Sequence, residues 1–407
     1  MTRASDTARL LGAGGTLNGA LSVDTISEKT SGSGVTIDSL NVKDGGIGGQ
    51  QIGGRRNIVI NGAMNVAQRS TSVTGLGDGD EGYVTVDRIR HSVTAGAGRF
   101  TSAQTAISDL PGFLNCLHLD CTTADTSIAS GELLRLEYRI EGQDLQLLKK
   151  GTSSAEKVTV SFYMKTNKAF TFMCELNDSD NNRVNVQQFT TSTSFTRHVL
   201  TFNGDTSGAL NDDSSVSLSV GIYLHAGNSF TGGTYSANTW QSRQSSDNMR
   251  AVGIGSFFDS TDNDIKITGL QVEVGSVATP FEHRSVGEEL ALCQRYYHRH
   301  VSDGSSQNMF GVGFIDGETA AAIQIHFPTT MRDQPSALET TGTAGDYAIR
   351  QRAGAAVTCN IVPAMSGDTT PNVAVISFGT AGSLTADSGC MGRAVNSGVH
   401  LSFTAEL

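Results

Sequence analysis

The sequence predicts an all-β protein, because short alternating apolar runs are separated by turn-forming residues along most of its length. The chain has 407 residues and 47 glycines, with 6% aromatic and 17% charged residues. Lys157 to Lys165 alternates apolar and polar side chains, as does a strand with one buried face. Turn signals such as Asn203-Gly204 between these runs favour antiparallel strands in a sandwich. This length predicts two or three domains.

The first 55 residues contain a repeat and form a predicted anchoring or shaft segment, 1–55. Segment 23–29 (VDTISEK) recurs fourteen residues later as segment 37–43 (IDSLNVK), with glycines between the copies. Each copy predicts one or two strands with a single apolar face, which two copies cannot cover by themselves. A partner must cover this face, and three parallel copies of the chain winding around a common axis would do so. The alternative is a disordered linker, for which the Gly and Ser content argues.

Residues 56–284 are predicted to form one antiparallel sandwich of roughly ten strands. Glu141–Leu148 is the one predicted helical turn inside it, and a shift in alternation near Gly269 predicts a bulge in the last strand. The clearest strand candidates are Asn57–Ile60, Thr85–His91, Leu117–Cys121, Leu133–Arg139, Lys157–Lys165, Phe170–Leu176, Arg197–Phe202, Ser217–Leu224 and Ile265–Val274.

The segment after the sandwich predicts a short helical connector, residues 285–299. Ser285 followed three residues later by Glu288 is a capping box, which predicts a helix that starts at residue 286. The apolar residues that share one face of this helix are Leu290, Cys293 and Tyr297.

The remaining residues, 300–407, predict a smaller all-β tip, a second sandwich in which the prolines fall in connections. Its size is enough for independent folding, but contact between subunits is also expected. The predicted strands are Phe310–Phe314, Ala320–Phe327, Ala355–Ile361, Asn372–Phe378 and Val399–Thr404.

Several of these segments resemble parts of phage tail-fibre and virion-appendage proteins. Ile265–Tyr297 resembles the end of the carbohydrate-binding-module-like jelly roll of these proteins, and Arg56–Arg69 with Tyr83–Arg90 resembles its start. Gly32–Gly48 resembles a fibre-shaft segment, and the final LSFTAEL resembles the last strand of their tip domains. The resemblance does not separate tail fibres from head fibres, because such segments are shuffled among virion parts.

The resemblance implies a structural, non-enzymatic fibre of a phage virion, assembled in the host cytoplasm as a homotrimer. It implies contacts with other virion proteins through residues 1–55 and binding of a host receptor or surface glycan by the jelly roll or the tip. Two alternatives remain open: a head fibre or capsid-decoration protein without a receptor role, and a polysaccharide depolymerase. No G-x-S-x-G, H-E-x-x-H or phosphate-loop motif favours an enzyme.

Charge and composition exclude other partners. The formal net charge is −11, and no lysine follows Lys266. This argues against duplex DNA and anionic membranes as partners, because both bind surfaces rich in Lys and Arg. No segment approaches the roughly 20 apolar residues of a membrane span, and the apolar run near the amino terminus is too short for a signal peptide. The six cysteines form no C-x-x-C pair and are predicted to be buried free thiols.

A glycan site is predicted in the polar loop Ala226–Arg250, which holds the only tryptophan. An aromatic ring can stack on the C–H face of a sugar while amide and guanidinium groups bind its hydroxyls. The alternative is a buried tryptophan that pins the loop to the sandwich, in which case the tip loops 303–307 and 341–347 become the candidates. The predicted glycan-binding residues are Tyr235, Asn238, Trp240, Gln241 and Arg243.

A structural calcium ion is the one cofactor that the sequence raises. Asp178, Asp180 and Asn182 place oxygen ligands at alternate positions, as a calcium loop does. The pattern does not complete an EF-hand, and a solvated turn is the alternative. The same two interpretations apply to two further clusters: Asp78, Asp80 and Glu81; and Asp259, Asp262 and Asp264.

Overall fold

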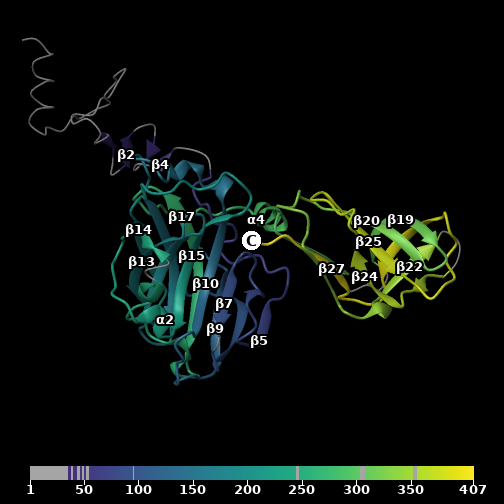
Figure 1. Cartoon of the computed structure of the whole chain (residues 1–407), viewed down its shortest axis with the longest axis horizontal. Coiled ribbons are helices and arrows are strands. Elements are labelled where there is room, and N and C mark those ends of the chain that lie inside the picture. The colour runs from purple at the N-terminus through teal and green to yellow at the C-terminus, as the bar shows by residue number, and fades with distance from the viewer. Residues whose placement is uncertain are drawn as a thin grey trace, which may run out of the picture. The chain divides into compact units, whose positions relative to one another are not determined.

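The computed structural model describes residues 55–94, 96–243, 247–302, 308–351 and 355–407, together with four short strands between residues 35 and 51 (Figure 1). The chain divides into two compact units, Met1–Gly54 and Arg55–Leu407. The protein is all-β with antiparallel sheets, as predicted. The finer domain boundaries at residues 284 and 299 stay predictions.

In the first unit, four strands form an antiparallel sheet in sequence order: β1 (Val35–Ile37), β2 (Leu40–Lys43), β3 (Gly46–Ile47) and β4 (Gln50–Gln51). The second copy of the repeat, 37–43, spans the end of β1 and all of β2. The first copy, 23–29, lies outside the described residues. Winding of three chains therefore stays a prediction.

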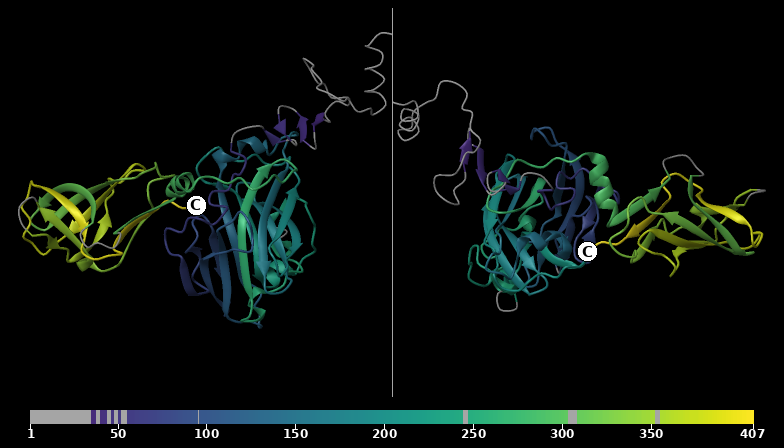
Figure 2. Two further views of the ribbon diagram at one scale, coloured as in Figure 1. Left: turned by 180° about the vertical axis from the view of Figure 1, so that it is seen from behind. Right: turned by 90° about the horizontal axis from the view of Figure 1, so that it is seen from above.

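The large sandwich consists of a seven-stranded and a six-stranded sheet, whose two layers can be followed in Figures 1 and 2. The seven-stranded sheet has the order β16-β13-β12-β15-β10-β7-β6, with bounds β6 (Gly82–Tyr83), β7 (Arg90–Thr94), β10 (Leu133–Glu141), β12 (Thr171–Asp178), β13 (Arg183–Thr190), β15 (Val216–Ala226) and β16 (Gln241–Ser242). The six-stranded sheet has the order β14-β11-β17-β9-β8-β5, with bounds β5 (Ser72–Leu76), β8 (Arg99–Ala106), β9 (Asn115–Thr123), β11 (Val158–Thr166), β14 (Thr196–Phe202) and β17 (Asp264–Val274).

The main core lies between these two sheets, and the two-residue period of each strand decides which side chains enter it. In β10 the even-numbered residues from Leu134 to Ile140 join the core, whereas the odd-numbered residues from Leu133 to Arg139 point the other way. We call the face of the seven-stranded sheet that points away from the six-stranded sheet the outer face. The alternation predicted for β11 is confirmed, since Val160, Phe162 and Met164 are core residues.

Some connections within the sandwich contain short helical turns. The predicted helical turn at Glu141–Leu148 is confirmed as two 3₁₀ helices, η1 and η2. The bulge predicted near Gly269 is also confirmed, because the register of β11 against β17 shifts there and Gly269 has φ +66°. The bounds of the turns are η1 (Gly142–Asp144), η2 (Gln146–Leu148), α2 (Asn228–Thr231), η3 (Asp247–Met249) and η4 (Phe257–Asp259).

Two predicted strands of the large sandwich are wrong. Asn57–Ile60 is not a strand, because most of its hydrogen bonds to β17 come from the Asn57 side chain, beside one backbone bond from Ile58 N to Val272 O at 3.0 Å. Its Oδ1 accepts from the backbone N–H groups of Val59 and Val272, each at 3.0 Å, and its Nδ2 donates to Leu270 O at 3.2 Å.

The second wrong strand is Thr85–His91, most of which forms a turn, so that β7 begins only at Arg90. Arg88 in this turn has φ 71°, a left-handed conformation incompatible with a strand. Its side chain is buried and pairs with Glu406, which explains how the conformation is held.

The capped helix is confirmed as α4 (Val286–Gln294). Ser285 is its N-cap, and its Oγ accepts from the backbone N–H of Glu288 at 3.2 Å. Cys293 and Tyr296 are buried against Ile60 and Val66 of the sandwich. The predicted apolar face is only partly right, because Leu290 is half-buried and Tyr297 begins the next strand instead of ending the helix.

The tip contains a three-stranded and a seven-stranded antiparallel sheet around a separate core. The orders are β18-β27-β21 and β23-β22-β26-β19-β20-β25-β24, and η5 (Ala344–Asp346) precedes β22. The strand bounds are β18 (Tyr297–Val301), β19 (Met309–Gly317), β20 (Ala320–His326), β21 (Ala337–Thr340), β22 (Tyr347–Gln351), β23 (Val357–Thr358), β24 (Ile361–Met365), β25 (Val373–Gly379), β26 (Gly389–Ala394) and β27 (His400–Thr404).

The predicted strand Ala355–Ile361 is wrong as a single element. Its residues fall in β23 and β24, which lie at opposite edges of the seven-stranded sheet. Between them Cys359 N donates to Tyr347 O at 2.9 Å and Asn360 N donates to Gly379 O at 3.1 Å, so the chain crosses from one edge to the other.

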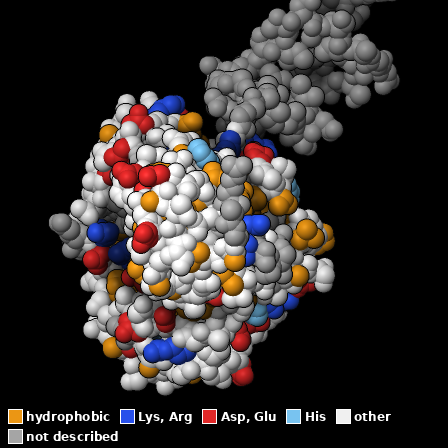
Figure 3. Space-filling model, turned by 90° about the vertical axis from the view of Figure 1, so that its right-hand side faces the viewer, with side chains coloured by type: hydrophobic (Ala, Val, Ile, Leu, Met, Phe, Trp, Pro, Cys, Tyr) orange, Lys and Arg blue, Asp and Glu red, His pale blue; other side chains and the backbone are white. Residues whose placement is uncertain are grey.

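Figure 3 shows one face of the molecule on which hydrophobic side chains are scattered in small groups among polar and backbone atoms. All six cysteines are buried free thiols, as predicted.

The cap of α4 gives a stability prediction. Ser285→Ala should lower the free energy of unfolding by about 1 kcal/mol, because the amide of Glu288 loses its acceptor. Ser285→Asn keeps an acceptor at the N-cap and should stay within a few tenths of a kcal/mol of wild type. Equal urea midpoints for wild type and Ser285→Ala would contradict the capping role.

The buried His91 gives a prediction about pH. Burial lowers its pKa to about 4. An unfolded chain with an ordinary histidine pKa near 6.5 therefore binds a proton that the folded chain does not, so stability falls as pH falls below about 6.5, by up to about 1.4 kcal/mol per pH unit. His91→Gln should lose about 2 kcal/mol less than wild type between pH 7 and 5 in urea unfolding. The same loss in both proteins would show that His91 is not the cause.

Candidate functional site

Trp240, the central residue of the predicted glycan site, is half-buried and packs against the sandwich core. Its Nε1 donates to Asn203 O at 2.6 Å, and Lys150 Nζ lies 5.4 Å from the ring centroid. These contacts fit the alternative in which the tryptophan holds its loop on the sandwich.

Three other predicted glycan-binding residues also make contacts within the fold. The Tyr235 hydroxyl accepts from Gln188 N at 3.0 Å. Asn238 has φ 52° and donates through Nδ2 to Thr201 O at 3.1 Å. Gln241 lies in β16 and pairs with Val184. The predicted set is therefore not assembled as one open site, but its fifth member, Arg243, lines the pocket described below.

The predicted calcium ligands are likewise not brought together. Asp178 is buried and forms an ion pair with Lys150 at 2.6 Å, whereas Asp180 accepts from the backbone N–H of Asn211 at 2.9 Å. Asn182 occupies a turn with φ 52°. Within the described parts of the chain, no group of three or more His, Cys, Asp and Glu side chains is arranged to hold a metal ion. A calcium site stays a prediction without support from these contacts.

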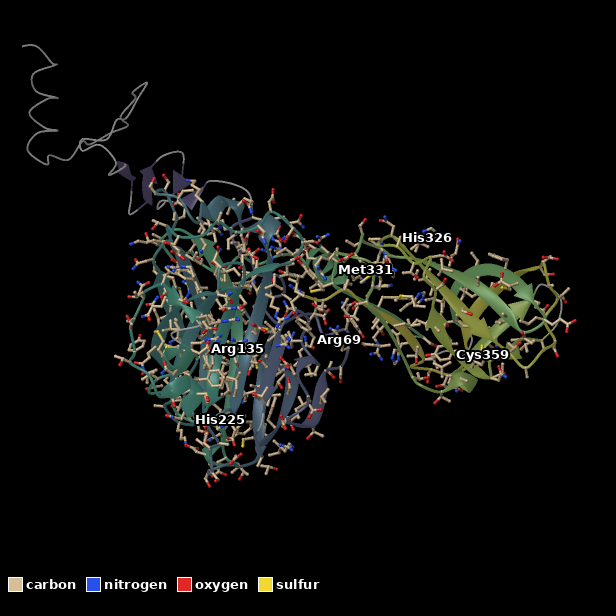
Figure 4. All side chains as sticks on the ribbon, in the orientation of Figure 1. Arg69, Arg135, His225, His326, Met331 and Cys359 are labelled. Atoms are coloured by element: carbon tan, nitrogen blue, oxygen red, sulfur yellow. The ribbon has the colours of Figure 1, made fainter. Side chains whose placement is uncertain are left out.

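A pocket of about 330 Å³ opens on the outer face of the seven-stranded sheet, and we call it the outer-face pocket. Its floor is formed by the outward residues of three neighbouring strands, and its rim by the loop between β15 and η4. Figure 4 labels Arg135 of β10, one of the residues that line this pocket. The polar and aromatic lining residues that matter below are Arg135, Glu137 and Arg139 from β10, Asn177 from β12, Tyr223 from β15, and Phe230, Arg243 and Arg250 from the loop.

Glu175 of β12 is the buried anchor beneath the floor of this pocket. Arg250 binds it in bidentate fashion, with Nε to Oε2 at 2.5 Å and Nη2 to Oε1 at 2.7 Å. Arg135 donates through Nη1 to the same Oε1 at 3.1 Å, and the Tyr223 hydroxyl donates to Oε2 at 3.4 Å. Both carboxylate oxygens of Glu175 are therefore occupied.

Glu137, two residues after Arg135 on β10, is bound by arginines in a similar way. Its Oε1 accepts from Arg135 Nη2 at 3.0 Å, and its Oε2 accepts from Arg139 Nε at 3.0 Å and from Arg90 Nη1 at 3.1 Å. Arg135 thus bridges Glu137 and Glu175. We call the chain of ion pairs formed by Arg250, Glu175, Arg135, Glu137 and Arg139 the charge ladder.

The charge ladder keeps its two carboxylates ionised although both are buried. Burial raises the pKa of Glu175, but Arg250 and Arg135 outweigh burial and hold that pKa below its ordinary value. For Glu137, burial is likewise outweighed by Arg135, Arg139 and Arg90, so its pKa is also lowered. Both groups remain charged at neutral pH.

The floor is shaped by a glycine and an aromatic ring. A Cβ on Gly221 of β15 would lie 2.8 Å from Arg135 Cδ, so the glycine leaves room for the arginine to lie across the strand. The Tyr223 ring lies beneath the guanidinium groups of Arg135 and Arg250, which are 5.4 and 5.7 Å from its centroid. Phe230 adds a half-buried ring at the rim.

A second polar cluster, Ser256, His225 and Glu132, was not anticipated from the sequence. Ser256 Oγ lies 2.7 Å from His225 Nδ1, and His225 Nε2 lies 3.1 Å from Glu132 Oε2. Burial lowers the pKa of His225, which favours a neutral imidazole. Ser256 Oγ also accepts from Phe258 N at 3.1 Å as the N-cap of η4. The cluster braces η4 on the sheet, and its residues are not among those that line the outer-face pocket.

The alternation of β10 carried a signal for the charge ladder that the sequence interpretation missed. Arg135, Glu137 and Arg139 alternate with apolar residues, so they belong on the face opposite the core. Their proximity to Glu175 and Arg250 depends on strand order, which the sequence pattern does not give.

Among the described residues, no helix combines the length and apolar composition needed to cross a membrane.

No protein-family model matches the sequence, and no curated protein matches it. Among solved structures, the chain is similar to the enzymatically active domain of tailspike protein 4 of bacteriophage CBA120, with 10% identity and TM-score 0.26 over 54% of this chain and 21% of that one. It is also similar to a family 11 carbohydrate-binding module from Clostridium thermocellum in complex with a β-1,3-1,4-mixed-linked tetrasaccharide, with 11% identity and TM-score 0.24 over 52% of this chain and 99% of that one. Similarities this low give no information about ligand or partner.

Removal of the central carboxylate should destabilise the sandwich. Glu175→Gln leaves Arg250 and Arg135 without their shared anion, which should lower the free energy of unfolding by about 3–5 kcal/mol. The control is Glu156→Gln, which removes an exposed pair with Lys149 and should cost at most about 1 kcal/mol. Equal losses for the two variants in urea unfolding would mean that the ladder is not a buried network.

Proposed function

We propose that the protein is a structural fibre or similar appendage of a phage virion, and that its large sandwich binds a surface saccharide in the outer-face pocket. The observation that carries the binding proposal is the pocket itself, which opens on a sheet face lined by guanidinium, amide and aromatic groups. Its volume, about 330 Å³, lies at the lower end of the range for small-ligand sites.

The pocket side chains suit a saccharide. Phe230 offers a half-buried ring at the rim for the C–H face of a sugar. Asn177 lines the pocket, and its Nδ2 donates to Ser179 Oγ and Ser219 Oγ over long distances of 3.4 Å each. A ligand hydroxyl can replace these weak contacts. Because the charge ladder fixes the floor, binding requires little rearrangement of the sheet.

The appendage role is supported by the sequence segments that resemble phage fibres at both ends of the sandwich and at the tip. We extend the proposal to a homotrimer that contacts other virion proteins through residues 1–55. A head-fibre or capsid-decoration role without receptor binding remains the alternative, and electron micrographs of virions carrying a labelled chain would distinguish it by position.

A binding role without catalysis is part of the proposal. Glycoside hydrolysis requires carboxyl groups that can act as acid and as base or nucleophile. Every carboxylate oxygen of Glu137 and Glu175 accepts a hydrogen bond from an arginine. Glu175 Oε2 also accepts from the Tyr223 hydroxyl. These contacts hold both carboxylates ionised and occupied, which disfavours them as general acids.

Glycan-array binding by the full chain tests the proposal. Wild type should bind a subset of saccharides without releasing shorter products, and Phe230→Ala should weaken that binding about tenfold, equivalent to 1.4 kcal/mol of lost stacking. The control is Phe195→Ala, which removes a half-buried ring that does not line the pocket and should leave binding unchanged.

Three results would count against the proposal. Absence of saccharide binding would remove the binding role, and binding that survives Phe230→Ala would place the site elsewhere on the chain. Release of oligosaccharides during incubation would favour the depolymerase alternative.

A further inference from the structure

The charge ladder occupies the carboxylate acceptors in and beneath the outer-face pocket. Each carboxylate oxygen of Glu137 and Glu175 already accepts from one or two arginine groups at 2.5–3.1 Å. A neutral sugar hydroxyl both donates and accepts, and protein sites for it ordinarily supply both kinds of group. In this pocket the carboxylate acceptors are already bonded to arginines. The charged side chains therefore offer a ligand mainly guanidinium donors.

Arg243 differs from the other arginines that line the pocket. Arg135 and Arg139 pair with Glu137, and Arg250 pairs with Glu175 and Asp247. Within the described residues Arg243 has no ion pair, and its Nη1 makes only a long 3.5 Å contact to Asn177 Oδ1. Among the residues that the structure describes, no carboxylate therefore neutralises the charge of this guanidinium.

The backbone position of Arg243 is fixed although its side chain is only half-buried. Its N–H donates to Asn182 O at 2.8 Å, directly after the strand pair of β16 with β13. The guanidinium is thus held at the rim of the pocket beside Asn177. In a protein with a net charge of −11, an unpaired cation at the rim of a donor-rich pocket gives a local preference for anions.

We propose that the outer-face pocket selects acidic saccharides, with Arg243 as the residue that pairs with a sugar carboxylate. This inference rests on the proposed saccharide binding and adds the substrate class. A guanidinium binds a carboxylate through two parallel N–H groups, which orients the sugar as well as attracting it. Phe230 then lies at the rim for the sugar's C–H face. Neutral saccharides lose the charge-assisted pair and bind more weakly.

An array of matched saccharides tests this selection on the full chain. The probes are oligogalacturonates with their methyl esters, and sialylated glycans with their desialylated forms, since each pair differs only in the acidic group or acidic sugar. At least one acidic member should bind about tenfold more tightly than its neutral partner, as expected for one charge-assisted pair. Raising the salt concentration from 50 to 500 mM should reduce the difference.

Variants of Arg243 then assign the selection to this residue. Arg243→Gln should weaken binding of the acidic member about tenfold and leave the neutral member within about twofold, whereas Arg243→Lys should restore part of the loss. The control is Arg350→Gln, which removes the same charge from an exposed position in the tip strand β22 and should leave both affinities unchanged.

The outcomes separate this inference from the proposed function. Equal affinity for acidic and neutral members, with both lost in Phe230→Ala, overturns the inference and keeps saccharide binding. An acid preference that survives Arg243→Gln also overturns it. Sulfated saccharides are the comparison arm: if they bind through Arg243 and carboxylated ones do not, the carboxylate assignment is wrong. Binding of no saccharide removes the proposed function and the inference together.

Discussion

Two buried glutamates on the outer face of the seven-stranded sheet constrain the rest of the large sandwich. Glu175 on β12 and Glu137 on β10 are 0% and 4% exposed, and each is stable there only because arginines share its charge. A one-residue slip of either strand would turn a charged residue into the apolar core. The charge ladder therefore fixes the register of the central strands, and through Arg250 it also holds the loop that forms the rim of the pocket.

The same network extends to the end of the described chain. Arg139, at the edge of the pocket, donates through Nε to Glu137 and through Nη1 to Leu407 O at 2.8 Å. Nearby, Glu406 pairs with the fully buried Arg88 and with Arg69. The segment that follows β27 thus returns to the sandwich through charged groups, whereas Cys293 of α4 and Tyr296, just after that helix, pack on it through apolar contacts. Polar and apolar contacts together join the tip strands to the sandwich.

Much of the fold followed from local patterns in the sequence. Alternation located most of the long strands, the Ser285 cap located α4, and the register change located the bulge at Gly269, because each depends on neighbours in the chain. Thr85–His91 was misjudged because Arg88 is held in a turn by Glu406, a residue far away in the sequence. The candidate site was harder to predict from the sequence, because it also depends on contacts between residues far apart in the chain. Arg243 was among the predicted glycan-binding residues, but the bidentate pair of Glu175 and Arg250 joins positions 75 residues apart.

The structure of the full chain in complex with an acidic trisaccharide, such as trigalacturonate, tests the central claim most directly. The account predicts ligand density in the outer-face pocket, with a sugar carboxylate within about 3 Å of the Arg243 guanidinium and a ring face against Phe230, above an unchanged pairing of Arg135 with Glu137 and Glu175. Ligand density beside Trp240 or in the tip, with the outer-face pocket filled only by water, would contradict it.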